Sequence, residues 1–205
     1  MKKVLKKISR GFIIVVLNIV FRTVYRMKVI GTKNIPKEGA LIFCGNHKTY
    51  FDPPAITVTN GRKMSFMAKE ELKENWLFAF LGWAFEAIYV KRDSKDIGPL
   101  KQSLTILKAG DCLGIFPEGT RNGMEKNNGE IKNGAAYLAL KTGAKIVPVG
   151  IVGNGKPFTR NAVIYGEPLD FSKYKEQKAD KELEERVSAE LMTKILELAS
   201  GNVVA

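Results

Sequence analysis

The chain has 205 residues, enough for one domain with its own hydrophobic core. Hydrophobic residues make up 45% and charged residues 26%, a globular composition that excludes disorder as the main state. Two cysteines and a single histidine exclude a disulfide framework and a zinc site built from several Cys and His ligands.

The net charge of +12 is concentrated at the N-terminus. Residues 1–37 carry ten basic side chains and no acidic one, which leaves 23 basic against 21 acidic residues in the remainder. A nucleic-acid-binding protein usually spreads its basic residues over the face that follows the phosphates. The nearly neutral body therefore argues against nucleic acid as a partner.

We interpret residues 1–28 as a basic, amphipathic N-terminal helix that precedes a domain spanning 29–205. Its apolar run, 11–21, is about half the roughly 20 residues that a membrane-spanning helix needs, and it contains Asn18. Residues 21–25 offer no small-residue cleavage site for a signal peptide. A helix lying in the membrane interface, with its basic residues near anionic headgroups, fits this pattern. The alternative is a helix packed on the protein's own core, and both can hold together.

Strand-like and helix-like segments alternate along the rest of the chain. Short apolar runs predict strands, and apolar residues three or four apart predict helices. Strands are expected at 40–44, 64–67, 87–90, 112–116, 145–152 and 162–165. Helices are expected at 70–81, 100–108, 132–141 and 180–198. This alternation predicts an α/β fold, a single domain with a central mostly parallel or mixed sheet flanked by helices.

A polar loop follows the expected strand at 40–44. It contains His47, with Asp52 five residues later and then two prolines. Asp52 suits the N-cap of a helix that begins with Pro53 and Pro54. A turn between the two polar residues would let the carboxylate hold one ring nitrogen of His47. The other nitrogen would then be available to accept a proton from a substrate hydroxyl, because imidazole has a reference pKa of about 6.5.

Cys44 is a weaker candidate for a reactive group. It stands three residues before His47, so a Cys–His nucleophile is conceivable. However, it belongs to an apolar run that reads as a buried strand, where cysteine behaves as a small hydrophobic residue.

A second loop follows the expected strand at 112–116. A glycine-containing turn after a strand can offer backbone N–H groups to a phosphate, and here Thr120 adds a hydroxyl and Arg121 a planar guanidinium. An ordinary turn explains the segment equally well if it is taken alone. Glu118 is unusual for a site that binds only anions, and it could orient Arg121 or contact a polyol hydroxyl.

Together these motifs resemble those of the glycerolipid acyltransferases, in particular the 1-acylglycerol-3-phosphate (lysophosphatidic acid) acyltransferases. The resemblance rests on Asn46-His47 followed by Asp52, and on the later Phe-Pro-Glu-Gly-Thr-Arg run at 116–121. Softer matches occur at 88–92 and 146–149, and the likeness covers roughly residues 30–170. Two departures stand out: Lys48-Thr49 occurs where Gln-Ser is common, and Lys91 where an acidic residue often precedes the arginine.

The resemblance implies roles for individual residues. His47 would be the general base and Asp52 its orienting partner, and the acceptor phosphate and glycerol would be held by Glu118, Gly119, Thr120, Arg121 and Arg92. The implied reaction moves a fatty acyl group from acyl-CoA or acyl-acyl-carrier protein to lysophosphatidate, giving phosphatidic acid. It needs no acyl-enzyme, metal or other cofactor. The enzyme would lie at the cell membrane, peripheral or monotopic on the cytoplasmic face.

Several alternatives stay open. The acceptor could be glycerol 3-phosphate or another lysophospholipid, or water in an acyl thioesterase. A membrane-binding module without catalysis is disfavoured by the intact His47 and Asp52. The aromatic segment 76–85 could line an acyl groove, dip into the membrane or form a plain core helix.

Overall fold

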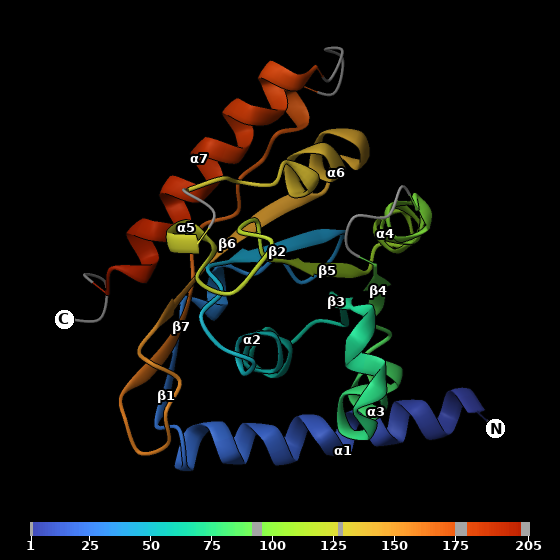
Figure 1. Ribbon diagram of the computed structural model, residues 1–205, viewed down its shortest axis with the longest axis vertical. Helices are drawn as coiled ribbons and strands as arrows, with labels where there is room; N and C mark the ends of the chain where they lie inside the picture. The colour runs from blue at the N-terminus through green and yellow to red at the C-terminus, as the bar shows by residue number, and fades with distance from the viewer. Residues whose placement is uncertain (1, 92–95, 127–128, 175–179, 202–205) are drawn as a thin grey trace.

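The computed structural model describes residues 2–91, 96–126, 129–174 and 180–201. These residues form a seven-stranded mixed sheet flanked by helices (Figure 1), which confirms the expected fold class. The strands are β1 Met27–Ile30, β2 Leu41–Gly45, β3 Met64–Lys69, β4 Ile88–Val90, β5 Cys112–Ile115, β6 Lys145–Val152 and β7 Asn161–Tyr165. The α-helices are α1 Lys2–Thr23, α2 Asp52–Thr59, α3 Trp76–Ala84, α4 Gly98–Lys108, α5 Gly123–Lys126, α6 Gly134–Thr142 and α7 Lys181–Ala199.

Strand β2 occupies a switch point in the sheet. The strand order is β1-β7-β6-β2-β5-β3-β4, and every neighbouring pair is parallel except β6 and β7. The chain builds β3, β4 and β5 on one side of β2 before it crosses to β6 on the other. In open α/β sheets, ligands bind in the crevice beyond the carboxyl ends of the strands at such a reversal. The loops after β2, β5 and β6 all open at this edge.

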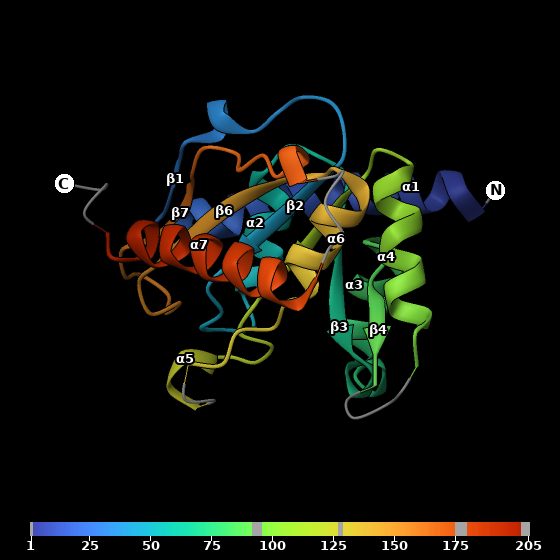
Figure 2. The same ribbon diagram turned by 90° about the horizontal axis from the view of Figure 1, so that it is seen from above.

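Alternate residues of β2 belong to the two halves of the core. Leu41 and Phe43 pack in one cluster with Phe21 of α1 and Ile56 of α2. Ile42 and Cys44 belong to a second cluster, which α4, α6 and α7 cover. This alternation is the two-residue period of a strand that is buried on both faces. Figures 1 and 2 show α1 and α2 on one side of the sheet and α4, α6 and α7 on the other.

Two parts of the structure differ from the sequence expectations. The helix expected at 70–81 is divided, because a 3₁₀ helix spans Glu70–Glu74 and α3 begins at Trp76. Asn75 separates them as an N-cap whose side-chain oxygen accepts the N–H groups of the second and third residues of α3. Strand β1 was not expected, and it runs across the anticipated boundary between residues 28 and 29. It pairs with β7, so the segment after α1 joins the sheet directly.

Helix α1 packs on the body and also exposes an apolar stripe. Ile13 and Phe21 are buried, and the Asn18 amide donates to the Val58 carbonyl of α2 at 2.8 Å. The core-packing interpretation of this segment is therefore correct. The opposite face exposes seven large apolar side chains at helical spacing: Val4, Leu5, Ile8, Phe12, Val15, Val16 and Ile19. None of the described helices is long and apolar enough to cross a bilayer.

Helix α7 ends beside the carboxyl edge of the sheet. Asp180 caps its start, because its side chain accepts the Leu183 N–H at 2.9 Å. Near its other end the helix lies directly on β6. A Cβ atom at Gly150 would stand 2.5 Å from Leu198, so only glycine permits this approach. The end of α7 is thereby held close to the loop that follows β2.

Candidate active site

His47 and Asp52 are in hydrogen-bond contact at the carboxyl end of β2. The chain leaves β2 at Gly45, turns, and enters α2 at Asp52. His47 Nδ1 lies 2.9 Å from Asp52 Oδ2. The His47 side chain is 17% exposed and the Asp52 side chain 3%, so the carboxylate is shielded while the ring keeps an open edge. A carboxylate that accepts from Nδ1 fixes the tautomer in which Nε2 is the proton acceptor.

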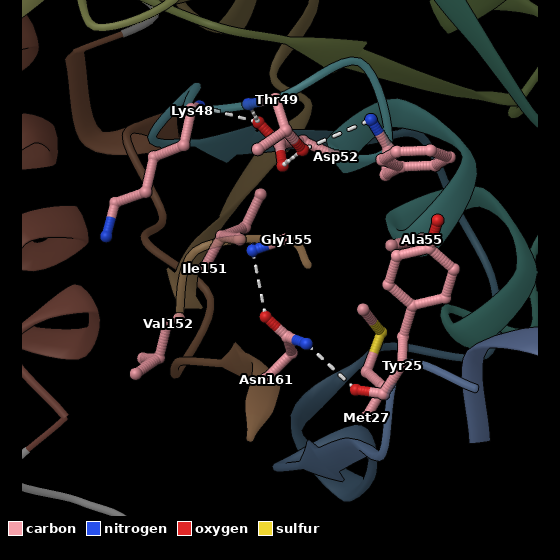
Figure 3. A pocket seen from close by; sticks show the side chains of 12 residues that line it. Tyr25, Met27, Lys48, Thr49, Asp52, Ala55, Ile151, Val152, Gly155 and Asn161 are labelled. Atoms are coloured by element: carbon pink, nitrogen blue, oxygen red, sulfur yellow. Dashed lines mark hydrogen bonds between the residues drawn. The ribbon is translucent and has the colours of Figure 1, made fainter. Parts of the chain in front are cut away.

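The Asp52 carboxylate organises the turn that carries His47. Its Oδ2 accepts the backbone N–H groups of Lys48 at 2.6 Å and Thr49 at 2.7 Å, and its Oδ1 accepts the Thr49 hydroxyl at 2.7 Å (Figure 3). The expected N-cap role is wrong, since Asp52 is the first residue of α2 and makes no cap hydrogen bond to it. Pro53 and Pro54 have no N–H to donate, so the carboxylate turns back to the preceding loop.

Aromatic stacking fixes the plane of the His47 ring. Its centroid lies 4.1 Å from that of Phe116, with 17° between the planes. Phe116 in turn stacks on Phe66 of β3 at 5.5 Å. The stack leads down to β5, where a Cβ atom at Gly114 would stand 2.1 Å from the Phe66 ring. Because Gly114 has no side chain, the Phe66 ring can lie against β5 and support Phe116, on which the His47 ring stacks.

Glu118 joins the two predicted loops. It is 3% exposed, and its Oε1 accepts the His47 backbone N–H at 2.9 Å while its Oε2 accepts the Met124 N–H at 3.2 Å. In the opposite direction, the Asn122 N–H donates to the His47 carbonyl at 2.6 Å. These bonds make the loop after β2 and the loop after β5 one connected unit.

Asn46 fastens the same loop to β6, a contact that the sequence reasoning did not find. Its amide Nδ2 donates to the Ile151 carbonyl at 3.0 Å, and its Oδ1 accepts the Ile151 N–H at 2.7 Å. Both bonds are buried, so the side chain acts as a short extension of the sheet. The only feature of the sequence that could have pointed to Asn46 is its position directly before His47.

The remaining predicted residues take different positions. The Arg121 guanidinium lies over the Tyr50 ring, 3.7 Å from its centroid. Gly119 adopts a left-handed φ of 66°, which glycine tolerates best. Gly119, Thr120 and Arg121 are absent from the described lining of the cavity beside His47, whereas Glu118 lines it. Arg92 lies outside the described residues.

A cavity of about 310 Å³ lies against His47. One wall is polar and includes Lys48, Glu118 and Asn122. The other includes Leu196 and Ala199 of α7, which the sequence reasoning also missed. The apolar periodicity of α7 predicts that one face of the helix is buried. It does not indicate which end of the helix lies near His47. The mixed lining suits a molecule with both a polar head and an apolar portion.

A second, much smaller cavity lies behind Asp52 (Figure 3). Its volume is about 20 Å³, and Thr49 and Tyr25 are among its lining residues. Asn161 closes it, since its Nδ2 donates to the Tyr25 carbonyl at 2.8 Å and its Oδ1 accepts the Gly155 N–H at 3.0 Å. This space suits about one water molecule. The larger cavity is therefore the candidate position for a substrate.

Cys44 is buried in the core, and burial raises the pKa of its thiol far above the usual value. A neutral, enclosed thiol is a poor nucleophile, so the Cys–His alternative is disfavoured. Among the described residues, no group of three or more His, Cys, Asp or Glu side chains is placed to hold a metal ion.

Residues 26–152 match the model of the acyltransferase family, and the chain therefore belongs to that family. It is 31% identical over 152 residues to the 1-acyl-sn-glycerol-3-phosphate acyltransferase of Bacillus subtilis, a match that covers 70% of this chain and 73% of that one. It is also 31% identical to the protein of the same name from Borreliella burgdorferi, over 66% of this chain and 54% of that one. The chain spans about half the length of several curated relatives that it matches.

A solved structure supports the same relationship. The crystal structure of the 1-acyl-sn-glycerophosphate (LPA) acyltransferase PlsC from Thermotoga maritima matches with a TM-score of 0.67 and 25% identity. The match covers 97% of this chain and 83% of that one. The resemblance that the His47 and Glu118 motifs indicated is confirmed by these relatives.

Proposed function

We propose that this protein transfers a fatty acyl group to the free hydroxyl of 1-acylglycerol 3-phosphate, giving phosphatidic acid. The donor is a thioester, acyl-CoA or acyl-acyl-carrier protein. The observation that carries the proposal is the 2.9 Å contact between His47 and Asp52 beside an open cavity. The acyltransferase family match and the names of the relatives point to the same reaction class.

His47 acts as the general base in this proposal. Its Nε2 accepts the proton of the acceptor hydroxyl while the oxygen attacks the thioester carbonyl carbon. The carbon–sulfur bond then breaks, and the departing sulfur receives the proton from His47. Asp52 holds the ring by Nδ1 and stabilises the imidazolium that forms between the two proton transfers. General-base catalysis of this kind is worth about 10²–10⁴-fold in rate.

The acceptor phosphate and glycerol are assigned to Arg121, Arg92 and the loop of Glu118, Gly119 and Thr120. Stacking of Arg121 on Tyr50 covers one guanidinium face and leaves the N–H edge to bind phosphate oxygens. Lys48 adds a cation to the wall of the cavity beside His47. Glu118 contributes by holding the His47 backbone, because its carboxylate already accepts two backbone N–H groups.

We place the enzyme at the cytoplasmic face of the membrane, with α1 in the interface. The exposed stripe of α1 supplies apolar side chains, and the first 37 residues supply ten cations for anionic headgroups. An acceptor that itself resides in the bilayer would be met at this surface.

A labelled acyl-transfer assay tests the reaction. The purified chain is given acyl-CoA or acyl-acyl-carrier protein with lysophosphatidate, glycerol 3-phosphate or another lysophospholipid. Phosphatidic acid is the expected product, and His47→Ala and His47→Gln each lower kcat by about 10²–10⁴-fold. The glutamine variant keeps a polar group beside Asp52, so it separates lost chemistry from lost folding. Acyl release that is independent of any acceptor indicates a thioesterase, and wild-type turnover by both variants contradicts the proposal.

Point substitutions test the membrane position of α1 better than deletion. Removing residues 1–26 would strip Phe21 and Tyr25 from the core and destabilise the fold itself. Ile8→Ser with Phe12→Ser changes only exposed side chains and should release the protein from anionic vesicles with its unfolding midpoint unchanged. Undiminished vesicle binding by this variant contradicts the interfacial position.

A further inference from the structure

Helix α3 turns its large apolar side chains outward. Trp76 is 78% and Phe80 41% exposed, Leu77 and Trp83 are also exposed, and Ala84 alone is buried among the residues of this helix. Positions 76, 77, 80 and 83 share one face of a helix. Of the alternatives left open for this segment, the plain core helix is therefore wrong. Exposed aromatic residues that cluster on one face mark an interaction surface.

This aromatic face borders α1. The Lys6 ammonium lies 5.8 Å from the centre of the Trp83 ring and pairs with Glu86, just beyond α3, at 3.1 Å. The Arg10 guanidinium lies 5.3 Å from the Phe85 ring centre. Figure 1 shows α1 and α3 next to each other on the same side of the sheet. Helices α1 and α3 therefore pack side by side, and each carries exposed apolar side chains.

We propose that these two faces form one docking surface for an anionic phospholipid bilayer, with both indoles at the depth of the headgroups. The inference rests on the proposed interfacial position of α1 and extends it to a second helix. Tryptophan favours the membrane interface because it combines an apolar ring with an N–H donor. The ten cations of residues 1–37 complement anionic lipid, whereas a second copy of this chain would bring two basic segments together.

Contacts connect this surface with the candidate active site. The Phe78 ring of α3 lies 6.0 Å from Tyr50, and Tyr50 carries the Arg121 guanidinium on its face at 3.7 Å. Tyr50 belongs to the loop between His47 and Asp52. A bilayer in contact with α3 would therefore lie next to the residues assigned to the acceptor phosphate.

The two helices contribute different forces. The 3₁₀ helix before α3 carries Glu70, Glu71 and Glu74 against a single lysine, Lys73, so this end of the surface adds no net positive charge. Attraction to anionic headgroups comes from α1 and weakens with salt. The contribution of α3 is apolar burial, which added salt does not screen.

Intrinsic fluorescence tests the inference directly, since the chain has two tryptophans and both, Trp76 and Trp83, lie in α3. Adding vesicles of phosphatidylglycerol and phosphatidylcholine to the full-length protein should shift tryptophan emission to shorter wavelength. Lipids brominated on the acyl chains should quench it. Phe80→Ser should weaken vesicle partition about tenfold, the value of burying one aromatic side chain. Ile97→Ser, at an exposed residue where α4 begins on the other side of the sheet (Figure 1), should leave partition unchanged.

The outcomes separate this inference from the proposed reaction. Vesicle binding without any change in tryptophan emission shows that α1 docks alone and overturns the inference. A blue shift that depends on protein concentration without lipid assigns the face to a second copy and also overturns it. His47→Ala should still show the full lipid-dependent shift, because docking precedes chemistry. If α3 inserts into the bilayer but the protein shows no transferase activity, the docking surface is supported and only the proposed function is contradicted.

Discussion

The Glu118 carboxylate accepts the His47 backbone N–H at 2.9 Å, although the two residues are 71 positions apart in the chain. The same carboxylate accepts the Met124 N–H, and Glu118 itself is buried. A charged acceptor gives strong hydrogen bonds in such surroundings. Glu118 therefore holds the position of His47 by its backbone, while Asp52 holds the ring.

Replacing Glu118 with glutamine should weaken both fold and catalysis. The amide offers one acceptor oxygen, and its NH₂ group would face the other backbone N–H. We expect the free energy of unfolding to fall by about 1–3 kcal/mol in urea titrations. If Glu118 acts by positioning, kcat should fall while KM for lysophosphatidate stays nearly constant.

A matched control is Glu125→Gln, an exposed glutamate in the same segment. It should change the free energy of unfolding by no more than about 0.5 kcal/mol. A rise in KM with unchanged kcat for Glu118→Gln would show direct contact with the acceptor and contradict the positioning role.

Gly114→Ala should disturb the site from within the sheet. The added Cβ would stand 2.1 Å from the Phe66 ring, which supports Phe116 and through it His47. Overpacking of this kind costs about 1–3 kcal/mol in stability, and a shifted stack should also lower kcat. Gly134→Ala is the control, because a Cβ there meets nothing within 4 Å.

A double substitution identifies the cause of the Gly114 effect. Phe66→Leu removes the ring that the new methyl group strikes, so the pair should be less destabilising than the sum of the single changes. A coupling free energy of about 0.5–3 kcal/mol is expected from urea midpoints. Simple additivity would mean that the Phe66 contact is not the origin of the loss.

Local patterns were enough to predict most of the fold. Strand β6 matches its predicted range of 145–152, and the helix predicted at 132–141 is α6, which ends at Thr142 before Gly143 with φ 72°. Such segments have a clear period and a clear stop signal, so neighbouring residues determine them. Strand β1 has four residues and gains its stability by pairing with β7, far along the chain, which no local pattern reveals.

The site was partly predictable for the same reason. His47 and Asp52 are five residues apart, and a turn-forming sequence between them implied their contact. The cap assignment of Asp52 failed because the loop N–H groups of Lys48 and Thr49 compete for its oxygens. The wall formed by Leu196 depends on how α7 lies across β6, a tertiary relationship that the helix sequence does not encode locally.

Cys44→Ala should retain turnover. Burial raises the pKa of the Cys44 thiol, so the folded enzyme holds it neutral at physiological pH. The cost should be a packing loss of about 0.5–1.5 kcal/mol, measured in urea. A water-soluble disulfide reagent should react with the wild type only after denaturation, because Cys112 is buried as well. Lost activity with intact stability would restore the thiol as a catalytic candidate.

Acid should loosen the attachment of α1 through Glu86. Burial raises the pKa of this carboxyl, but hydrogen bonds from Lys6 and Lys63 outweigh that and hold it below the usual 4.5. A carboxyl with a lowered folded-state pKa stabilises the fold above the unfolded value and loses this effect as pH falls through the folded value. Wild-type urea midpoints should therefore fall more between pH 6 and about pH 3 than those of Glu86→Gln. Glu71→Gln, at an exposed carboxylate, should follow the wild type, and equal slopes for all three proteins would contradict a stabilising role for this ion pair.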